Sequence, residues 1–385
     1  MRYYQSFTSK VIILVLTFLL PVFLYAKNTP PKVDAGVLIR VIYPATKNAT
    51  LIGSGSDAEG PVTFQWMQLG GNSVAKIAKP TNATTLVSNL KPGLYTFVLS
   101  ATDIDGVIRR DTTNVTVLEK LTWTTLGKFA REVVVHPPTG GSGPAPVIFA
   151  FHGHGGTDSG FAQRAFELFW PEAIVVYPQG LRTLGSENDP NCKQAGWQHS
   201  VGEINCRNNR KDQDLQFFDS ILVTLKKKYS VNTNLIFAHG WSNGADFVYN
   251  VLWPARANNL AGISPAGGTL DTIAGKKPMP LIHVAGTLDV HALYTDQQQS
   301  ALEVRILNQC SPKGTVWATG KGGLLGTHYD SPINDPVVFL QYDGDHSYPF
   351  TVPPLIVRFF KEVAGVSTMP LITKASPMNK HLSSK

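Results

Sequence analysis

Zinc-binding patterns are absent from this sequence, which has only three cysteines in 385 residues. None of the three has a cysteine or histidine partner at the two- to four-residue spacing of a zinc site. In an exported chain, three cysteines are typical of one disulfide and one free thiol. Cys192 and Cys206 bracket a polar loop and form the candidate disulfide pair, with buried free thiols as the alternative; Cys310 is expected to stay unpaired.

A concentrated basic stripe is also missing, although the formal net charge is +7. Five of the positive charges lie near the two ends of the chain: Arg2, Lys10, Lys374, Lys380 and Lys385. The one basic run, Lys226 to Lys228, ends a predicted helix, where cations interact favourably with the helix dipole. Nucleic-acid binding would require clustered cations with interleaved aromatic residues, so we predict no nucleic-acid partner.

Long hydrophobic runs are limited to the N-terminus, where residues 1–26 have the pattern of a secretory signal peptide. Arg2 and Lys10 flank or precede the apolar run Val11 to Phe23, and Ala26 is a candidate cleavage position. An uncleaved anchor is the alternative, but the run is short for a bilayer span and Pro21 interrupts it. We therefore expect a secreted protein (extracellular, periplasmic or at the cell surface) with no membrane span in the mature chain.

Residues 31–119 predict a small, all-β, immunoglobulin-like sandwich. Short runs of β-favouring residues alternate there with Gly, Pro and Asp-rich turns, at the spacing of antiparallel strands. The runs are Leu38 to Ile42, Thr63 to Trp66, Tyr95 to Leu99 and Val115 to Leu118. The residues around Trp66 alternate apolar and polar, which favours a core position over a sugar-binding platform.

Residues 122–364 predict an α/β domain with a mostly parallel central sheet. Near-continuous apolar runs alternate there with helical stretches, as in sheets covered on both faces. The runs are Pro146 to Phe151, Ala173 to Tyr177, Asn234 to Ala238, Pro280 to Val284 and Val337 to Tyr342. Residues 365–385 lack periodicity and are expected to form a flexible tail.

The strongest chemical signal is the pentapeptide from Gly240 to Gly244, which has Ser242 at its centre. It follows an apolar strand and precedes a potential helix, which is the context of a nucleophile elbow. Small flanking residues are needed because the serine must occupy a strained turn. We predict Ser242 as a nucleophile, and the alternative is a glycine-rich connecting turn.

Asp289 and His346 are the candidate partners of Ser242. A serine hydroxyl needs a base, and the base needs an acid that orients it. In hydrolases with a nucleophile elbow, these residues follow one another along the chain in the order serine, acid, histidine. Both residues follow predicted strands at their carboxyl ends. Asp343 and Asp345 remain alternatives for the acid, whereas His291 is too close to Asp289 and His328 is expected in a loop.

Two backbone N–H groups are the predicted donors to the oxyanion that forms during acyl transfer. One belongs to Asn243, the residue after the nucleophile. The other belongs to His154 in the glycine-rich segment from Phe151 to Gly156, which follows the first α/β strand. Metal ligation by His152 and His154 is the alternative, but the further ligands are missing. The mechanism implies no metal and no organic cofactor.

The N-terminal segment resembles the PKD or immunoglobulin-like modules of bacterial surface proteins. The resemblance rests on "GSGSDAEGPVTFQWMQLGG", "LKPGLYTFVLSATDIDG" and "DTTNVTVLE". It implies a spacer or adhesive domain, with carbohydrate binding as the alternative.

Residues 122–364 resemble secreted α/β-hydrolases of the carbohydrate esterase family 1 lineage, which includes polyhydroxybutyrate depolymerases, feruloyl esterases and acetyl xylan esterases. The match includes "VVYPQG" from Val175, Gly196-Trp197, and "DQDLQFFDSIL" from Asp212. It implies a structural role for Asp212 and Asp214, either capping a helix or fixing a loop of the active site. It also suggests three residues for the substrate cleft: Trp197, Trp241 and Tyr348, with core packing as the equal alternative for Trp197. Tyr348 and Asp345 depart from the family pattern, which carries mostly tryptophan and glycine there.

These observations predict a secreted serine esterase that forms an acyl-enzyme. Its expected substrate is a feruloyl or acetyl ester on plant polysaccharide, and poly(3-hydroxybutyrate) or another polyester is the alternative. A peptidase of the same fold is a further possibility. A non-catalytic cell-surface interaction protein is the alternative of another class. The sequence does not predict an oligomeric state.

Overall fold

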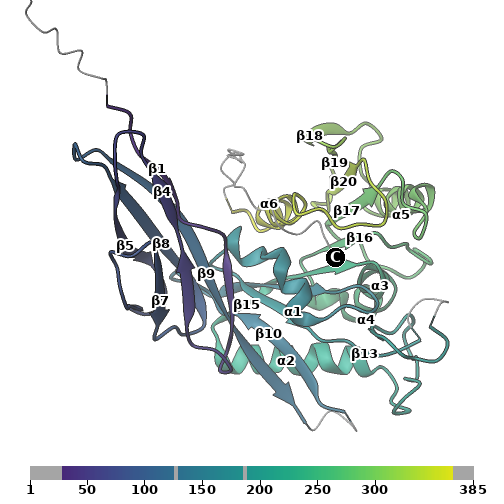
Figure 1. Cartoon of the computed structure of the whole chain (residues 1–385). Coiled ribbons are helices and arrows are strands. Elements are labelled where there is room, and N and C mark those ends of the chain that lie inside the picture. The colour runs from purple at the N-terminus through teal and green to yellow at the C-terminus, as the bar shows by residue number, and fades with distance from the viewer. Residues whose placement is uncertain (1–27, 125–128, 185–188, 367–385) are drawn as a thin grey trace, which may run out of the picture.

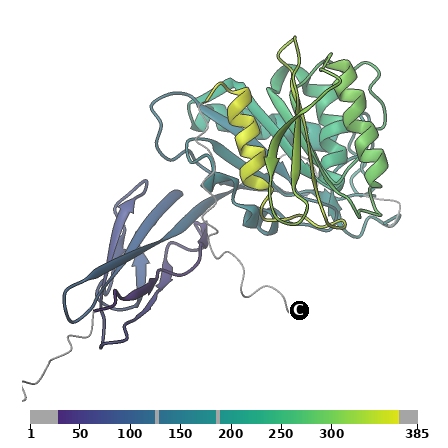
Figure 2. The ribbon, with the colours of Figure 1, turned by 90° about the horizontal axis from the view of Figure 1, so that it is seen from above.

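The computed structural model describes residues 28–124, 129–184 and 189–366. The predicted signal peptide, residues 1–26, lies outside the described residues, as do residues 367–385 of the predicted tail. An all-β part projects from one edge of an α/β part, as Figures 1 and 2 show. None of the helices in the described ranges has the length and apolar composition needed to span a bilayer.

The N-terminal part is a sandwich with its own hydrophobic core. Its strands are β1 (Lys32–Asp34), β2 (Ile39–Tyr43), β3 (Ala49–Ile52), β4 (Ser54–Ser56), β5 (Thr63–Gly70), β6 (Lys76–Ile77), β7 (Thr84–Ser88), β8 (Gly93–Thr102) and β9 (Ile108–Trp123). One layer contains β2, β5, β8 and β9, and the other contains β3, β6 and β7. Trp66 is buried between them and donates from Nε1 to the Ala83 carbonyl, so its predicted core position is confirmed.

The α/β part is organised around a twisted sheet in the order β9-β10-β12-β11-β15-β16-β17-β20, extended by β19 and β18. The remaining strands are β10 (Arg131–His136), β11 (Ala145–Phe151), β12 (Ile174–Pro178), β13 (Leu181–Arg182), β14 (Ala195–Gly196), β15 (Val231–Trp241), β16 (Gly262–Ala266), β17 (Leu281–Gly286), β18 (Thr315–Thr319), β19 (Leu325–Tyr329) and β20 (Val337–Tyr342). From β12 to β20 neighbouring strands are parallel, whereas β10 is antiparallel to both of its neighbours. This is the α/β-hydrolase arrangement, and the predicted fold class is confirmed.

Helices cover both faces of this sheet. They are α1 (Asp158–Phe161), η1 (Ala162–Arg164), η2 (Phe166–Leu168), α2 (Gln213–Lys228), α3 (Asn243–Asp246), η3 (Phe247–Leu252), α4 (Trp253–Arg256), η4 (Ala257–Asn259), α5 (Tyr294–Leu307) and α6 (Pro353–Val363). Apolar side chains of α2, η3 and α5 pack on one face, and those of α1, η2 and α6 pack on the other. Figure 1 shows α2 and α6 on opposite sides of the sheet.

Two features differ from the sequence-based expectations. The predicted boundary between residues 119 and 122 falls within β9, which continues without a break because its first half pairs with β8 and its second half with β10. His328 lies in strand β19, not in a loop, because β19 pairs with β20 and places His328 opposite Val338.

Candidate active site

Ser242 occupies a strained turn between β15 and α3. Its backbone has φ 54° and ψ −125°, a region that non-glycine residues rarely adopt. The flanking glycines allow the chain to fold this tightly. A Cβ atom on Gly240 would lie 2.0 Å from the Gly244 carbonyl oxygen, and one on Gly244 would lie 2.5 Å from the Phe151 carbonyl oxygen. The sequence requirement for small residues therefore has a direct steric cause.

The structure brings Ser242, His346 and Asp289 together from three separate segments. Nε2 of His346 lies 2.8 Å from Ser242 Oγ, and its Nδ1 lies 2.8 Å from Asp289 Oδ2. Because an ionised carboxylate can only accept hydrogen bonds, Nδ1 carries the proton and Nε2 is left to accept one from the serine. The imidazole bonds Asp289 and not the alternative acids Asp343 or Asp345.

Asp289 is buried and fully hydrogen-bonded. Its Oδ1 accepts from the backbone N–H groups of His291 and Ala292, at 2.9 and 3.0 Å. Its Oδ2 accepts from His346 and from Nε2 of Gln297, the latter at 3.2 Å. Four donors compensate the desolvation of a carboxylate whose side chain has no solvent exposure.

Aromatic side chains pack against the loop that carries His346. The Trp241 ring lies 4.8 Å from the His346 ring, and Tyr348 packs edge-on against Trp241. The Tyr348 hydroxyl lies 3.0 Å from Nε2 of buried His239, and the Tyr348 carbonyl accepts from Arg164. These contacts fix the imidazole beside the serine.

Two of the three predicted cleft residues are corrected by their burial. Trp197 has no solvent exposure and Tyr348 has only 7%, so neither forms the surface of a cleft. Trp197 packs against Phe151 and Phe247, and its indole N–H donates to the His152 carbonyl. Both aromatic residues support the site from the core, whereas Trp241 is partly exposed beside Ser242.

The predicted oxyanion donors border the nucleophile. The backbone N–H of Asn243 is the first N–H of helix α3. Gly153, the residue before His154, lies against the nucleophile, since a Cβ atom on Gly153 would lie 3.2 Å from Ser242 Cβ. No hydrogen bond from the backbone N–H of Asn243 or His154 is found within the described ranges. Both groups are therefore available to a developing negative charge.

His152 has a structural environment and not that of a metal ligand. Its Nε2 accepts from the Gly180 N–H at 3.0 Å, and its Nδ1 faces the Gly153 carbonyl at 2.7 Å. Burial lowers the pKa of His152 to about 4, which keeps the ring neutral and able to accept. In the part of the chain that the structure describes, no cluster of three or more His, Cys, Asp or Glu residues could hold a metal ion.

Residues 189–206, here called the bridged loop, lie against both oxyanion segments. A disulfide joins Cys192 to Cys206, whereas Cys310 is a free, partly exposed thiol. Near the first cysteine, Asp189 Oδ2 lies 3.2 Å from Nε2 of His154. The Gly155 N–H donates to the Ala195 carbonyl at 2.7 Å. The loop thus holds the segment that contains the first donor.

The bridged loop also holds the segment of the second donor. The Asn243 side chain accepts from the Trp197 N–H at 2.7 Å and donates to its carbonyl at 3.1 Å. This is a role for the Asn243 amide that the sequence motif did not indicate, since the motif concerns only the backbone.

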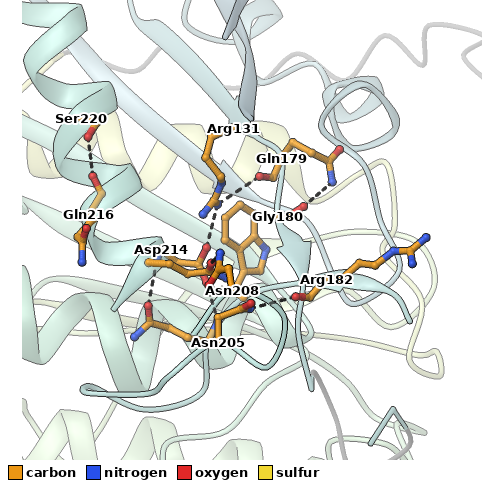
Figure 3. Close-up of polar contacts among 12 residues, drawn as sticks. Arg131, Gln179, Gly180, Arg182, Asn205, Asn208, Asp214, Gln216 and Ser220 are labelled. Carbon is orange, nitrogen blue, oxygen red and sulfur yellow. Dashed lines mark hydrogen bonds and ion pairs between the residues drawn. The ribbon is translucent and has the colours of Figure 1, made fainter. Parts of the chain in front are cut away.

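The base of the bridged loop is anchored to α2 and β10, as Figure 3 shows in part. Asp214 accepts from the Gln198 N–H and pairs at 2.8 Å with Arg131, in a fully buried ion pair. Asn205 donates to the Arg182 carbonyl at 3.0 Å. Asp212 makes no helix cap with its side chain; it accepts from Gly202 and Gln198 and so fixes the loop, one of its two predicted roles.

Three residues of this site were not found by sequence reasoning: Asp189, Gln297 and the side chain of Asn243. Asp189 lies three residues before Cys192, and Gln297 lies on a helix eight residues after the acid. Neither position has a local pattern that distinguishes it from an ordinary surface residue.

Residues 35–117 match a family model of the PKD domain. The predicted resemblance of the N-terminal part to PKD modules is confirmed. The chain is 25% identical over 167 residues to the bifunctional acetylxylan esterase/xylanase XynS20E of Neocallimastix patriciarum, which covers 41% of this chain and 21% of that protein. It is 28% identical over 180 residues to feruloyl esterase D of Neurospora crassa, which covers 46% of this chain and 54% of the relative.

The chain therefore spans about a fifth of the length of the acetylxylan esterase/xylanase and about half of the length of feruloyl esterase D. The predicted similarity to acetylxylan and feruloyl esterases is confirmed over these matched segments. Among solved structures, an acetyl xylan esterase from Aspergillus awamori aligns with a TM-score of 0.46 and 13% identity, over 63% of this chain and 98% of its own.

Proposed function

We propose that the protein is a serine esterase in which Ser242 is the nucleophile, His346 the general base and Asp289 its orienting acid. The observation that carries the proposal is the continuous series of hydrogen bonds from Ser242 Oγ through His346 to Asp289, each 2.8 Å long. The strained backbone of Ser242 and the two unengaged N–H groups beside it support the same assignment.

The reaction proceeds in two steps through an acyl-enzyme. Ser242 Oγ attacks the ester carbonyl carbon while its proton moves to His346 Nε2, and the N–H groups of His154 and Asn243 stabilise the oxyanion. The alcohol departs with the proton from His346 and leaves the acyl group on Ser242. Water then attacks this ester with His346 as base, which releases the carboxylic acid and restores the serine.

An acetyl or feruloyl ester of plant polysaccharide is the proposed substrate class. The names of two relatives, an acetylxylan esterase and a feruloyl esterase, support this choice. Polyester is the competing substrate. Hydrolysis of p-nitrophenyl acetate, acetylated xylan, methyl ferulate, poly(3-hydroxybutyrate) film and a proline peptide discriminates among these, and a preference for film or peptide would contradict the proposal.

The catalytic assignment is tested by covalent labelling. A fluorophosphonate should label the wild-type chain at Ser242, and Ser242→Ala should abolish labelling and hydrolysis. Ser220→Ala is a suitable control, because Ser220 lies on α2 and its hydroxyl donates to the Gln216 carbonyl within the helix. Well-folded wild-type protein without labelling or hydrolysis would favour a non-catalytic interaction protein.

Export from the cytoplasm is part of the proposal. Residues 1–26 carry the signal-peptide pattern, and the Cys192–Cys206 disulfide is of the kind that persists in oxidising compartments. The expected observation is a mature protein in the periplasm or medium that lacks these residues by mass spectrometry. Only full-length, cytoplasmic protein would contradict export.

A further inference from the structure

Three buried polar side chains form a hydrogen-bonded series behind the acid: Tyr249, His283 and Gln297. They come from η3, β17 and α5, and none has solvent exposure. Tyr249 Oη lies 2.7 Å from His283 Nδ1, and His283 Nε2 lies 3.1 Å from Gln297 Oε1. Gln297 Nε2 lies 3.2 Å from Asp289 Oδ2. The esterase mechanism uses none of these three residues directly.

The direction of every donor in this series is determined. The Gln297 amide nitrogen must face Asp289, because the carboxylate only accepts, and it also donates to the Ala292 carbonyl at 2.7 Å. Gln297 Oε1 therefore faces His283, whose Nε2 must carry a proton. The other nitrogen of His283 then accepts from the Tyr249 hydroxyl. Tyr249 and His283 thus hold the Gln297 amide in the one orientation that donates to the acid.

Gln297 and His346 donate to the same oxygen, Asp289 Oδ2, while Oδ1 is occupied by two backbone N–H groups. Each additional donor spreads the negative charge of the carboxylate and weakens its attraction for the imidazolium. If Gln297 is removed, Oδ2 is left to His346 alone. The bond between Asp289 and His346 should then strengthen and make the imidazole more basic.

We propose that Gln297 is a positioning residue that holds the ionised Asp289 in place and sets the basicity of His346, with His283 and Tyr249 fixing its orientation. The inference rests on the proposed function. The other titratable groups around His346 and Asp289 are His291, whose ring lies 5.2 Å from that of His346, together with Tyr342 and Asp345. All three are unchanged in the variants below.

Gln297→Met tests the proposal, because methionine has a similar volume but no donor. We expect kcat on p-nitrophenyl acetate to fall roughly five- to tenfold, the equivalent of one ordinary hydrogen bond, with KM nearly unchanged. The acid limb of the kcat/KM profile should move up by roughly half to one pH unit. Gln299→Met is the matched control, since exposed Gln299 lies on the same helix and its side chain bonds Glu303, away from Asp289.

Gln297→Leu gives a second variant without a donor. Leucine also leaves Asp289 Oδ2 without the amide hydrogen bond, so the acid limb should move up as in Gln297→Met. This variant decides the question if the methionine variant does not fold. An unchanged acid limb in both folded variants, or in the leucine variant where it alone folds, would overturn the proposal.

A double-mutant cycle separates positioning from simple packing. If Gln297 acts through the acid, Gln297→Met should cause no further loss of kcat in an Asp289→Asn background. Losses that multiply, together with a lowered Tm and an unshifted pH profile, would indicate a packing role and refute the inference. Absence of hydrolysis and labelling in the wild-type protein would instead refute the proposed function itself.

Discussion

Opening the Cys192–Cys206 disulfide should weaken the proposed oxyanion site while leaving the fold intact. The bridged loop contacts both donor segments, through Asp189 and Ala195 on one side and through Trp197 on the other. The perturbation is either dithiothreitol or the double substitution of Cys192 and Cys206 by alanine. The hydrogen bonds between Ser242, His346 and Asp289 do not involve this loop.

The size of the effect follows from the loop length and from the contacts that the loop makes. The cysteines are 14 residues apart, and a disulfide that closes a loop of about this length restricts the unfolded chain by about 3 kcal/mol. The buried Arg131–Asp214 pair and buried Trp197 still hold the base of the loop. Each oxyanion donor contributes roughly 100- to 1000-fold to kcat. Partial displacement of these donors should therefore lower kcat by roughly 10- to 100-fold.

Steady-state hydrolysis of p-nitrophenyl acetate, with and without reductant, measures this effect. Circular dichroism and Tm establish whether the reduced protein remains folded. Cys310→Ser is the control, because this thiol is unpaired and should neither change kcat nor alter the response to reductant. A folded, reduced enzyme with wild-type kcat would refute the argument that the bridged loop positions the donors.

Three further substitutions test other parts of the structure. Gly244→Ala should lower both Tm and kcat, because the added methyl group would overlap backbone carbonyl groups of Phe151 and His152. Gly143→Ala is the control, because a methyl group there meets no atom within 4 Å and should leave Tm unchanged. His136→Leu should stabilise the fold by about 1–3 kcal/mol at pH 7.5, because both ring nitrogens are buried and have no hydrogen-bond partner among the described residues. Burial lowers the pKa of His136 to about 3, whereas the unfolded chain binds a proton there as the pH falls below about 6.5. Wild-type protein therefore loses stability towards pH 5 and the leucine variant does not, so the gain in Tm should grow in that direction. A gain that does not depend on pH would contradict this. Arg40→Ala should lower Tm, because it removes three hydrogen bonds between the sandwich and the α/β part. Substitution of the exposed Arg109 by alanine is the control. An unchanged Tm in Arg40→Ala would indicate that these bonds contribute nothing to stability.

The elbow and the central strands could be predicted because their causes are local. A serine at a positive φ needs small neighbours at fixed spacing, and Gly240 and Gly244 satisfy that need within five residues. Buried parallel strands are read as apolar runs, and Val337 to Tyr342 was predicted with the bounds that β20 has. The chain order of the fold then indicated where Asp289 and His346 belong.

Other features depend on packing that no local pattern encodes. Gln297 meets Asp289 only because α5 packs against β17 at a particular height, so its glutamine looks like its neighbours Gln298 and Gln299. The sequence left Trp197 open between the cleft and the core, because an aromatic residue near a motif looks the same whether it faces solvent or packs in the core. Its burial is decided by Phe151 and Phe247, which lie on other elements.

The relation between the two parts of the chain follows from strand pairing and not from the sequence of either part. A spacer module joined by a flexible linker would leave the boundary unpaired, but β9 is hydrogen-bonded to β8 before the boundary and to β10 after it. Strand β2 pairs with the middle of β9, and its Arg40 bonds the carbonyls of Ala162 and Gln163. The residue before these, Phe161, packs on His239 and Tyr348, which hold the loop of His346. Because these contacts are continuous, the sandwich is joined to the α/β part through a shared strand and through side-chain hydrogen bonds, and not through a flexible linker.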